Sequence, residues 1–468
     1  MVPRGRRIFC NRTLNLRSIR AIGYDMDYTL IHYHVAEWEA HAYGHVLRRL
    51  AARGWPVEDL AFDPQMMIRG LIIDTELGNV VKANRFGFVK VAQHGTTLIP
   101  FEQMRETYSR VIVDLSEPRW RFMNTLFSMS EACLYAQLVA CLDDGKMPPG
   151  IGYPDLYTAI RRAFDEVHAE GDLKAEIVAA PERFVDLDER TALALLDQKH
   201  AKKKLMLITN SEWSYTAPIM AFAFDRFLPG DMTWRELFDL VIVSARKPSF
   251  FTDDNPAFEV VDEDGLLRPV IRDLEPGKSY VGGSAKQVQA AFGLHGDEVL
   301  YVGDHIFSDV NVSKQVQRWR TALILREMED EIAALEAFRG SQAELEALMA
   351  QKEQLEGQQC AVRVAELRAE HGYGPKDDRD LETLRADAGR IREALDALDA
   401  RIKPLAIESG RLGSDKWGPL MRAGNDKSHL ARQVERYADV YLARVSDFAA
   451  ESPFAYLRSV RGSLPHDR

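Results

Sequence analysis

Residues 19–30 constrain the fold of this chain more than any other stretch. A short apolar run, 21–24, ends abruptly at Asp25, and a second aspartate, Asp27, follows after one intervening residue. Open α/β sheets bind their ligands at the carboxyl ends of strands, and alternate residues of an extended chain share a face. Both carboxylates can therefore be presented at one sheet edge. We interpret this stretch as a phosphoryl-transfer site, in which one carboxylate attacks phosphorus and the other handles the proton.

Later apolar runs predict four more buried strands, at 205–208, 240–243, 298–302 and 320–325. Helical segments alternate with these runs, a pattern that favours a doubly wound parallel sheet. The sequence thus predicts an α/β fold built on such a sheet.

The chain between the first two predicted strands has a different pattern. The spacing predicts an amphipathic helix over 37–52, a β meander over 71–91, and helices over 124–142 and 154–170.

Residues 328–405 are rich in Ala, Glu, Leu, Arg and Gln. From Leu381 to Leu405 the apolar residues keep a 3-4 spacing, which indicates a coiled-coil seam, and a Gly/Pro break falls at 372–375. We predict a long antiparallel helical hairpin. A solvated packing arm is the simpler interpretation, and a partner-binding arm is the alternative.

Composition excludes several classes of protein. The 468 residues suffice for two or three domains, and 60 basic against 71 acidic residues, a net charge of −11, argue against a general nucleic-acid binder. The four cysteines show no metal-ligand spacing. No run approaches the roughly 20 apolar residues of a membrane helix, and the basic N-terminus lacks the apolar stretch of a signal peptide. We expect a soluble, cytoplasmic protein without a nucleic-acid or membrane partner.

Polar residues stand at the ends of three further predicted strands. Thr209 ends one of them, where its hydroxyl and neighbouring backbone amides can hold phosphate oxygens, and Lys247 follows the next, where its ammonium can neutralise charge on the phosphoryl group. Asp304 and Asp309 follow the third. Mg²⁺ takes oxygen ligands, often carboxylates together with substrate phosphate, so these acids predict a Mg²⁺ site.

The order of these motifs resembles the haloacid-dehalogenase (HAD) superfamily of aspartyl-phosphate enzymes. It appears as DMDYT at 25–29, TNS at 209–211, the lysine of RKP at 246–248, and GDHIFSD at 303–309. Further motifs are similar to the cytosolic purine 5′-nucleotidase family, which prefers IMP and GMP: RGL at 69–71, HG at 94–95, NTLF at 124–127, GDHIF at 303–307 and RYAD at 436–439.

The resemblance implies a double displacement. Asp25 would attack the 5′-phosphate and form an aspartyl-phosphate, while Asp27 would protonate the leaving ribose oxygen and later deprotonate water. Mg²⁺ would be held by Asp25, Asp304 and the backbone carbonyl of Asp27, with Asp309 in support. A nucleoside acceptor in place of water would make the enzyme a phosphotransferase.

A second set of residues is expected to bind the substrate. Arg161, Asp165 and His168 share one helix face by their spacing, and Lys174 follows just past a glycine. On spacing alone, a surface Arg–Asp pair beside a histidine is the simpler interpretation. The resemblance instead assigns these four to purine binding and Phe127 to base stacking. It also assigns Asn210 and Ser211 of the TNS motif to the substrate.

We accordingly predict a HAD-like catalytic core at 1–35 and 180–327, with a cap for substrate recognition at 36–179. The helical hairpin is inserted at 328–405, and a C-terminal segment, 406–468, packs back on the core. The predicted function is Mg²⁺-dependent hydrolysis of purine nucleoside 5′-monophosphates by a homo-oligomer. The alternatives are a HAD phosphatase for another phosphomonoester, and a non-enzymatic scaffold that binds partners through the hairpin.

Overall fold

The structure is a computed structural model that describes residues 4–460. The predicted terminal segments include residues 1–3 and 461–468, which lie outside this range. The chain forms two compact units: one comprises the chain up to Glu329 and from Leu420 onward, and the other is Asp330–Pro419.

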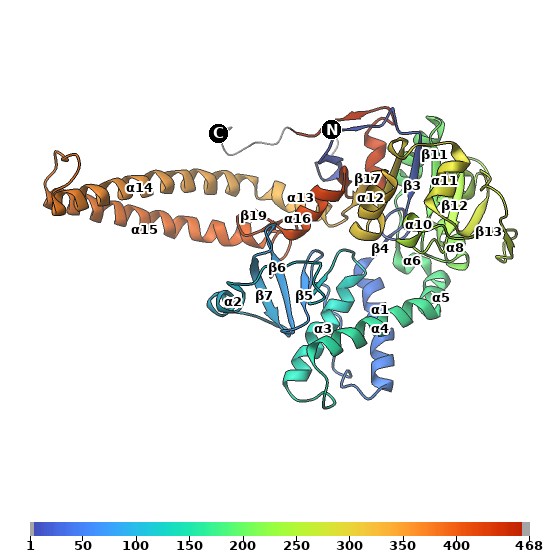
Figure 1. The fold of residues 1–468 in the computed structure, drawn as a ribbon, viewed down its shortest axis with the longest axis horizontal. Helices are drawn as coiled ribbons and strands as arrows, with labels where there is room; N and C mark the ends of the chain where they lie inside the picture. The colour runs from blue at the N-terminus through green and yellow to red at the C-terminus, as the bar shows by residue number, and fades with distance from the viewer. Residues whose placement is uncertain (1–3, 461–468) are drawn as a thin grey trace. The chain divides into compact units, whose positions relative to one another are not determined.

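The first unit is built on one large sheet with a parallel centre (Figure 1). Its strands are β1 (Phe9–Cys10), β3 (Ala21–Tyr24), β11 (Lys204–Ile208), β12 (Leu240–Val243), β13 (Ala257–Val260), β14 (Leu267–Pro269), β15 (Ser279–Gly282), β16 (Val299–Gly303), β17 (Arg320–Ile324) and β20 (Val440–Leu442). Within residues 4–460 the order is β1-β20-β17-β16-β3-β11-β12-β15-β13-β14. Neighbours from β20 to β15 are parallel, and β1, β13 and β14 add antiparallel edges. The predicted mixed α/β class is confirmed, and the four later strands lie within one residue of their predicted ends.

Strand β3 lies at the centre of this sheet, between β16 and β11, and all four of its residues are buried. A Cβ on Gly23 would lie 2.8 Å from the ring of Tyr301 on β16, so only glycine allows this close approach. Because β3, β11, β12 and β16 are parallel neighbours, their carboxyl ends meet at one edge.

Helices that connect these strands include α7 (Glu189–His200), α8 (Trp213–Phe224), α11 (Ala285–Phe292), α12 (Val312–Gln317) and α16 (His429–Tyr437). Part of the core is an apolar cluster in which Phe250, Phe251 and Trp319 pack with the buried faces of β11, β12 and β16. Within 4–460, no helix has both the length and the apolar character that a bilayer-spanning segment requires.

A second group of elements in this unit follows β3. It contains an antiparallel sheet of β5 (Ile72–Asp74), β6 (Asn79–Ala83), β7 (Val89–His94), β8 (Thr97–Leu98) and β9 (Trp120–Phe122), and the helices α1 (Val35–Ala52), α3 (Ser128–Asp143), α4 (Tyr153–Glu170) and α5 (Asp172–Ala179). Helices α1, α3 and α4 pack on one another (Figure 1). The predicted meander is present, but β8 and β9 were not predicted. The helix expected over 124–142 begins at Ser128, because hydrogen-bonded turns occupy residues 125–129.

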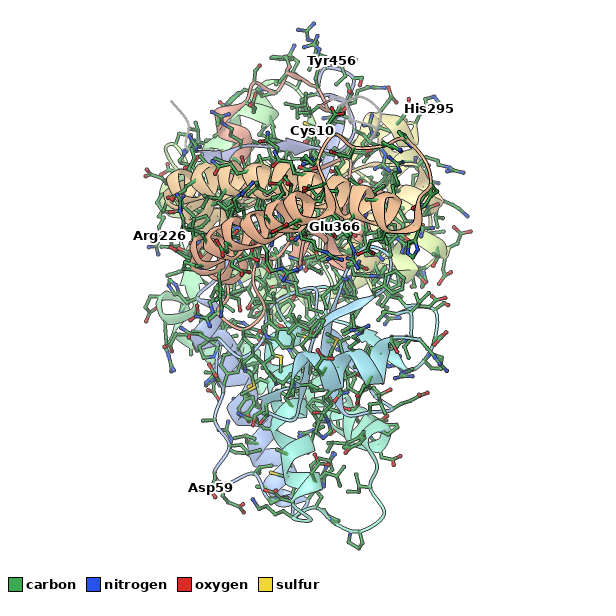
Figure 2. All side chains as sticks on the ribbon, turned by 90° about the vertical axis from the view of Figure 1, so that its left-hand side faces the viewer. Cys10, Asp59, Arg226, His295, Glu366 and Tyr456 are labelled. Atoms are coloured by element: carbon green, nitrogen blue, oxygen red, sulfur yellow. The ribbon has the colours of Figure 1, made fainter. Side chains whose placement is uncertain are left out.

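The second unit contains a helical hairpin of α14 (Arg339–His371) and α15 (Leu381–Arg411). Apolar residues from both helices form two buried clusters along the seam, one around Leu348, Leu398 and Ile402 and the other around Val362, Ala365 and Leu384. Side chains project all round both helices (Figure 2); most of those outside the clusters are polar or charged, and Met349, Val364, Leu367 and Ile407 are exposed apolar exceptions. The prediction ended the hairpin at 405, where the apolar seam stops, but α15 continues to Arg411.

Candidate active site

Three buried aspartates meet at the carboxyl edge of the parallel sheet. Asp25 follows β3, Asp304 follows β16, and Asp309 lies in the helical turn Ile306–Asn311. One carboxylate oxygen from each lies within 4.8 Å of those of the other two. Strand order explains this cluster, because β3 and β16 are adjacent and parallel.

Lys247, which follows β12, is the buried cation of the cluster. Its Nζ lies 2.7 Å from Oδ1 of Asp25 and 2.8 Å from Oδ1 of Asp309, and it donates to the Tyr301 hydroxyl at 3.2 Å. Asn210 holds the lysine backbone from both sides: its Oδ1 accepts the Lys247 N–H at 2.6 Å, and its Nδ2 donates to the Lys247 carbonyl at 3.2 Å. Asn210 thus positions Lys247, and its predicted contact with substrate stays a prediction.

The charges of this cluster do not balance. Burial raises the pKa of Asp25 well above its usual range, against the lowering effect of Lys247, and the carboxylates of Asp309 and Asp304 raise it further. Burial also raises the pKa of Asp304 to about 7, although Arg69 opposes the shift. Even with the Arg69 guanidinium acting on Asp304, one ammonium among three carboxylates leaves excess negative charge in a buried place. Carboxylate oxygens are the ligands that Mg²⁺ prefers, so these side chains fit a Mg²⁺ ion.

Two residues outside the predicted set hold Asp304. The Thr125 hydroxyl donates to Oδ2 of Asp304 at 2.8 Å. The buried guanidinium of Arg69 donates to the backbone carbonyls of Asp304, Asn124 and Ile324. Arg69 and Thr125 lie in sequence motifs noted above, but a motif alone assigns neither of them a partner.

The Asp27 carboxylate has different surroundings. It accepts hydrogen bonds from the Tyr33 hydroxyl at 2.5 Å and the Ser211 hydroxyl at 2.7 Å. Tyr33 is in turn hydrogen-bonded to the Tyr215 hydroxyl at 2.9 Å, and Thr209 Oγ1 accepts the Ser211 N–H at 3.0 Å. Neutral hydroxyl groups therefore hold Asp27, whereas an ammonium holds Asp25, and the two carboxylates are set up for different tasks.

A cavity of about 470 Å³ lies beside the cluster. Its lining combines residues of the NTLF segment with the inner face of α4, and includes Asn124, Thr125, Phe127, Arg161, Asp165, His168 and His305. Thr125 also contacts Asp304 directly, so the cavity reaches the acid cluster. The structure thus brings four of the predicted substrate residues to one place.

Side chains in this cavity are arranged by their neighbours. Arg161 contacts Glu131 at 2.8 Å and Asp165 at 3.0 Å. His168 donates from Nδ1 to the Phe164 carbonyl at 2.7 Å, burial lowers its pKa, and its buried Nε2 has no hydrogen-bond partner among the described residues. Glu131 was missed by sequence reasoning, although a lone acid at a buried position of the apolar α3 is a detectable signal.

Lys174 lies elsewhere. Its Nζ is 3.0 Å from Glu212 and 5.4 Å from the centre of the Tyr215 ring. Gly171, with φ of +83°, ends α4, and Lys174 belongs to the separate helix α5. The structure therefore places Lys174 over Tyr215, the partner of Tyr33, and outside the cavity lining, although its charge acts on His168.

Comparison with known proteins agrees with this geometry. The family model described as the 5′ nucleotidase family matches residues 8–468. The chain belongs to the 5′-nucleotidase family. A 5′-nucleotidase domain-containing protein of Dictyostelium discoideum is 27% identical over 479 residues, which cover 98% of this chain and 74% of that protein. As a member of the 5′-nucleotidase family, the chain is a phosphoric monoester hydrolase, and a purely non-enzymatic scaffold is not supported.

Proposed function

We propose that this chain is a Mg²⁺-dependent nucleotidase that hydrolyses purine nucleoside 5′-monophosphates, IMP and GMP, through an aspartyl-phosphate on Asp25. The observation that carries the proposal is the pairing of Asp25 with Lys247 next to a cavity lined by Phe127 and Arg161. This arrangement sets a phosphoryl-transfer centre beside a cavity that can hold a flat purine base.

The contacts of Asp25 determine which of its oxygens reacts. Within the described residues, its hydrogen bond from the Met26 N–H, 2.8 Å, and its ion pair with Lys247 both go to Oδ1. We therefore assign Oδ2 as the nucleophile. It forms a bond to phosphorus while the bond to the ribose O5′ breaks, and Asp27 gives its proton to that oxygen.

The second step reverses the roles of the two carboxylates. Asp27 takes a proton from water, whose oxygen attacks phosphorus, and the bond to Asp25 breaks to release orthophosphate. A nucleoside hydroxyl in place of water would give the phosphotransferase reaction. Asp25, Asp304, Asp309 and the Asp27 carbonyl would hold Mg²⁺, whose positive charge would offset the charge of the phosphoryl group.

The residues that line the cavity support the proposal of a purine substrate with a 6-oxo group. Arg161 can donate to that oxygen, Asp165 can accept from the base N1–H, and the buried Nε2 of His168 offers an acceptor. Phe127 adds an aromatic face, and its ring centre lies 4.8 Å from that of Trp38. The role predicted for Lys174 toward the substrate stays a prediction.

Phosphate release from a panel of nucleoside monophosphates and sugar phosphates, with and without EDTA, tests the proposal. We expect activity on IMP and GMP that EDTA and Asp25→Asn abolish. Arg161→Ala should raise KM for IMP about 10-fold to 100-fold, because a hydrogen bond to a charged group contributes about 1.5–3 kcal/mol. The matched control is Arg162→Ala, since Arg162 is exposed on α4 and pairs with Glu166. Equal turnover of a sugar phosphate, unaffected by Arg161→Ala, would establish the alternative substrate.

The proposal includes a cytoplasmic location and a homo-oligomer. Cell fractionation tests the cytoplasmic location. Light scattering coupled to size-exclusion chromatography tests the homo-oligomer.

A further inference from the structure

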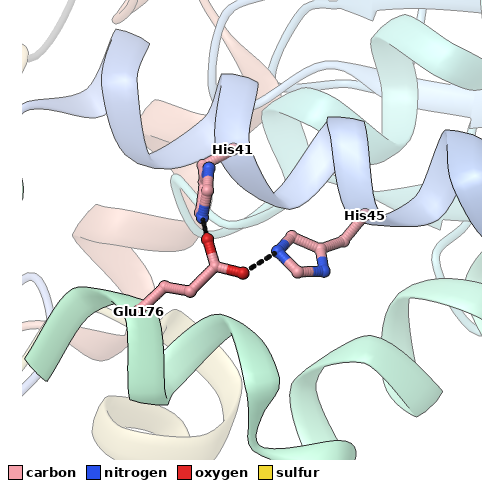
Figure 3. Close-up of side chains that lie close together, drawn as sticks. All are labelled: His41, His45 and Glu176. Carbon is pink, nitrogen blue, oxygen red and sulfur yellow. Dashed lines mark ion pairs between the residues drawn. The ribbon is translucent and has the colours of Figure 1, made fainter. Parts of the chain in front are cut away.

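We propose a second metal site in this chain, separate from the acid cluster, that binds a divalent transition-metal ion such as Zn²⁺. Its ligands are His41 and His45 of α1 and Glu176 of α5 (Figure 3). One ligand atom from each residue lies within 4.8 Å of those of the other two. None of these residues takes part in the proposed hydrolysis.

The two histidines have the spacing of a helical metal site. Residues four apart share one face of a helix, and two histidines at this spacing bind Zn²⁺ in metalloprotease helices. The rings of His41 and His45 lie 5.0 Å apart, nearly perpendicular to each other. Both rings face the same carboxylate, which comes from a different helix (Figure 3).

The distances are close to those of a coordination shell. Oε2 of Glu176 lies 2.5 Å from Nε2 of His41, and Oε1 lies 3.2 Å from Nε2 of His45. Ligands at about 2.0–2.1 Å from a tetrahedral Zn²⁺ are about 3.3 Å apart. The His45 contact already has about this length, and the His41 contact would reach it by lengthening by less than about 1 Å.

One carboxylate faces both buried histidine nitrogens. Glu176 gives one oxygen to Nε2 of His41 and the other to Nε2 of His45. A neutral imidazole nitrogen can present a lone pair in place of a proton. An ion that accepts the lone pairs of both nitrogens would then bind all three side chains.

Access suits a cation. The side chains of His41 and His45 are 18% and 13% exposed, whereas that of Glu176 is 49% exposed, which leaves an entry path on the α5 side. Arg48 places positive charge near His45, and the carboxylates of Glu176 and Asp172 oppose it. Three protein ligands leave a fourth position for water. Imidazole favours ions such as Zn²⁺, whereas the all-oxygen acid cluster favours Mg²⁺.

A bound ion would join α1 to α5. Lys174 lies two residues before Glu176 on α5, so the ion would also restrain the helix that carries this lysine.

Calorimetric titration of the full, untagged chain with Zn²⁺ tests the proposal, after metal has been removed with a chelator and with millimolar Mg²⁺ present to saturate the acid cluster. We expect one Zn²⁺ per chain and a higher Tm. The double substitution His41→Ala/His45→Ala should weaken binding by at least about 100-fold, since loss of outer-shell partners alone weakens metal sites about 10–100-fold. Glu176→Gln, at a half-exposed position, is the milder variant and should also weaken binding.

The matched control is His200→Ala/His295→Ala, which removes two exposed histidines of the same unit (His295 is labelled in Figure 2). It should bind Zn²⁺ like the wild type. Titration with Co²⁺ gives a second readout, in which we expect visible absorption bands of a four-coordinate ion that the His41/His45 variant lacks. Absence of binding by the wild type, which would leave an ion pair only, or equal binding by the wild type and the His41/His45 variant, would overturn the proposal.

Discussion

Replacing the buried acid Glu39 with glutamine should stabilise the protein above neutral pH. Glu39 is fully buried on α1, accepts the Ser130 N–H at 3.1 Å, and contacts the Tyr28 hydroxyl at 3.4 Å. Burial raises its pKa from 4.5 to about 7. The folded state therefore binds this proton more tightly than the unfolded state, and stability falls as pH rises from about 4.5 to about 7.

The expected magnitude follows from this shift. At about 1.4 kcal/mol per pH unit, the penalty for Glu39 reaches about 3 kcal/mol above pH 7 and is absent below pH 4.5. Glutamine cannot ionise and still offers an acceptor to Ser130 and a donor to Tyr28. Glu39→Gln should thus match the wild type near pH 4.5 and exceed its free energy of unfolding by about 3 kcal/mol at pH 8.

Urea denaturation at several pH values measures this difference. Tryptophan fluorescence suits the first unit, which contains six of the seven tryptophans. The matched control is Glu37→Gln on the same helix, where an exposed ion pair with Arg183 should contribute less than about 1 kcal/mol at any pH. A pH-independent difference between Glu39→Gln and the wild type would refute the reasoning.

Two further substitutions test the catalytic edge of the sheet. Lys247→Met should lower the free energy of unfolding in EDTA by about 3–5 kcal/mol, the usual result of breaking a buried ion pair. The control Lys204→Met, at an exposed pair, should lower it by less than about 1 kcal/mol. Equal losses for the two variants in urea titrations would contradict the claim that burial strengthens the contribution of Lys247. Gly23→Ala should lower the free energy of unfolding by about 1–3 kcal/mol through overpacking, because the added Cβ would lie too close to the Tyr301 ring. Unchanged stability and kcat would show that the Tyr301 ring can move aside without loss.

Features that depend on local pattern could be predicted from the sequence. Short apolar runs mark β11, β12 and β16 because parallel strands are buried on both faces. The acids and Lys247 follow strand ends, so the order of strands alone brings them to one edge. The 3-4 spacing from Leu381 to Leu405 predicts the seam of the hairpin, because that face must be buried against another helix.

Features that depend on distant partners could not be predicted. No local signal pairs Asp27 with Ser211, because these residues are 184 positions apart and meet only after β3 and β11 align. Strands β8 and β9, two and three residues long, were not predicted. The contact of His41 and His45 with Glu176 also depends on a distant partner. The spacing of the two histidines is visible in the sequence, but nothing in the sequence identifies Glu176 as the third residue.

Trapping the covalent intermediate tests the central claim most directly. The enzyme would be mixed with IMP that carries a labelled phosphate, quenched in acid before the steady state, and digested for peptide mapping. We predict an acid-stable, hydroxylamine-sensitive label on Asp25, which is absent from Asp25→Asn. Label on any other residue, or turnover of IMP by an enzyme that never carries label on Asp25, would contradict the account.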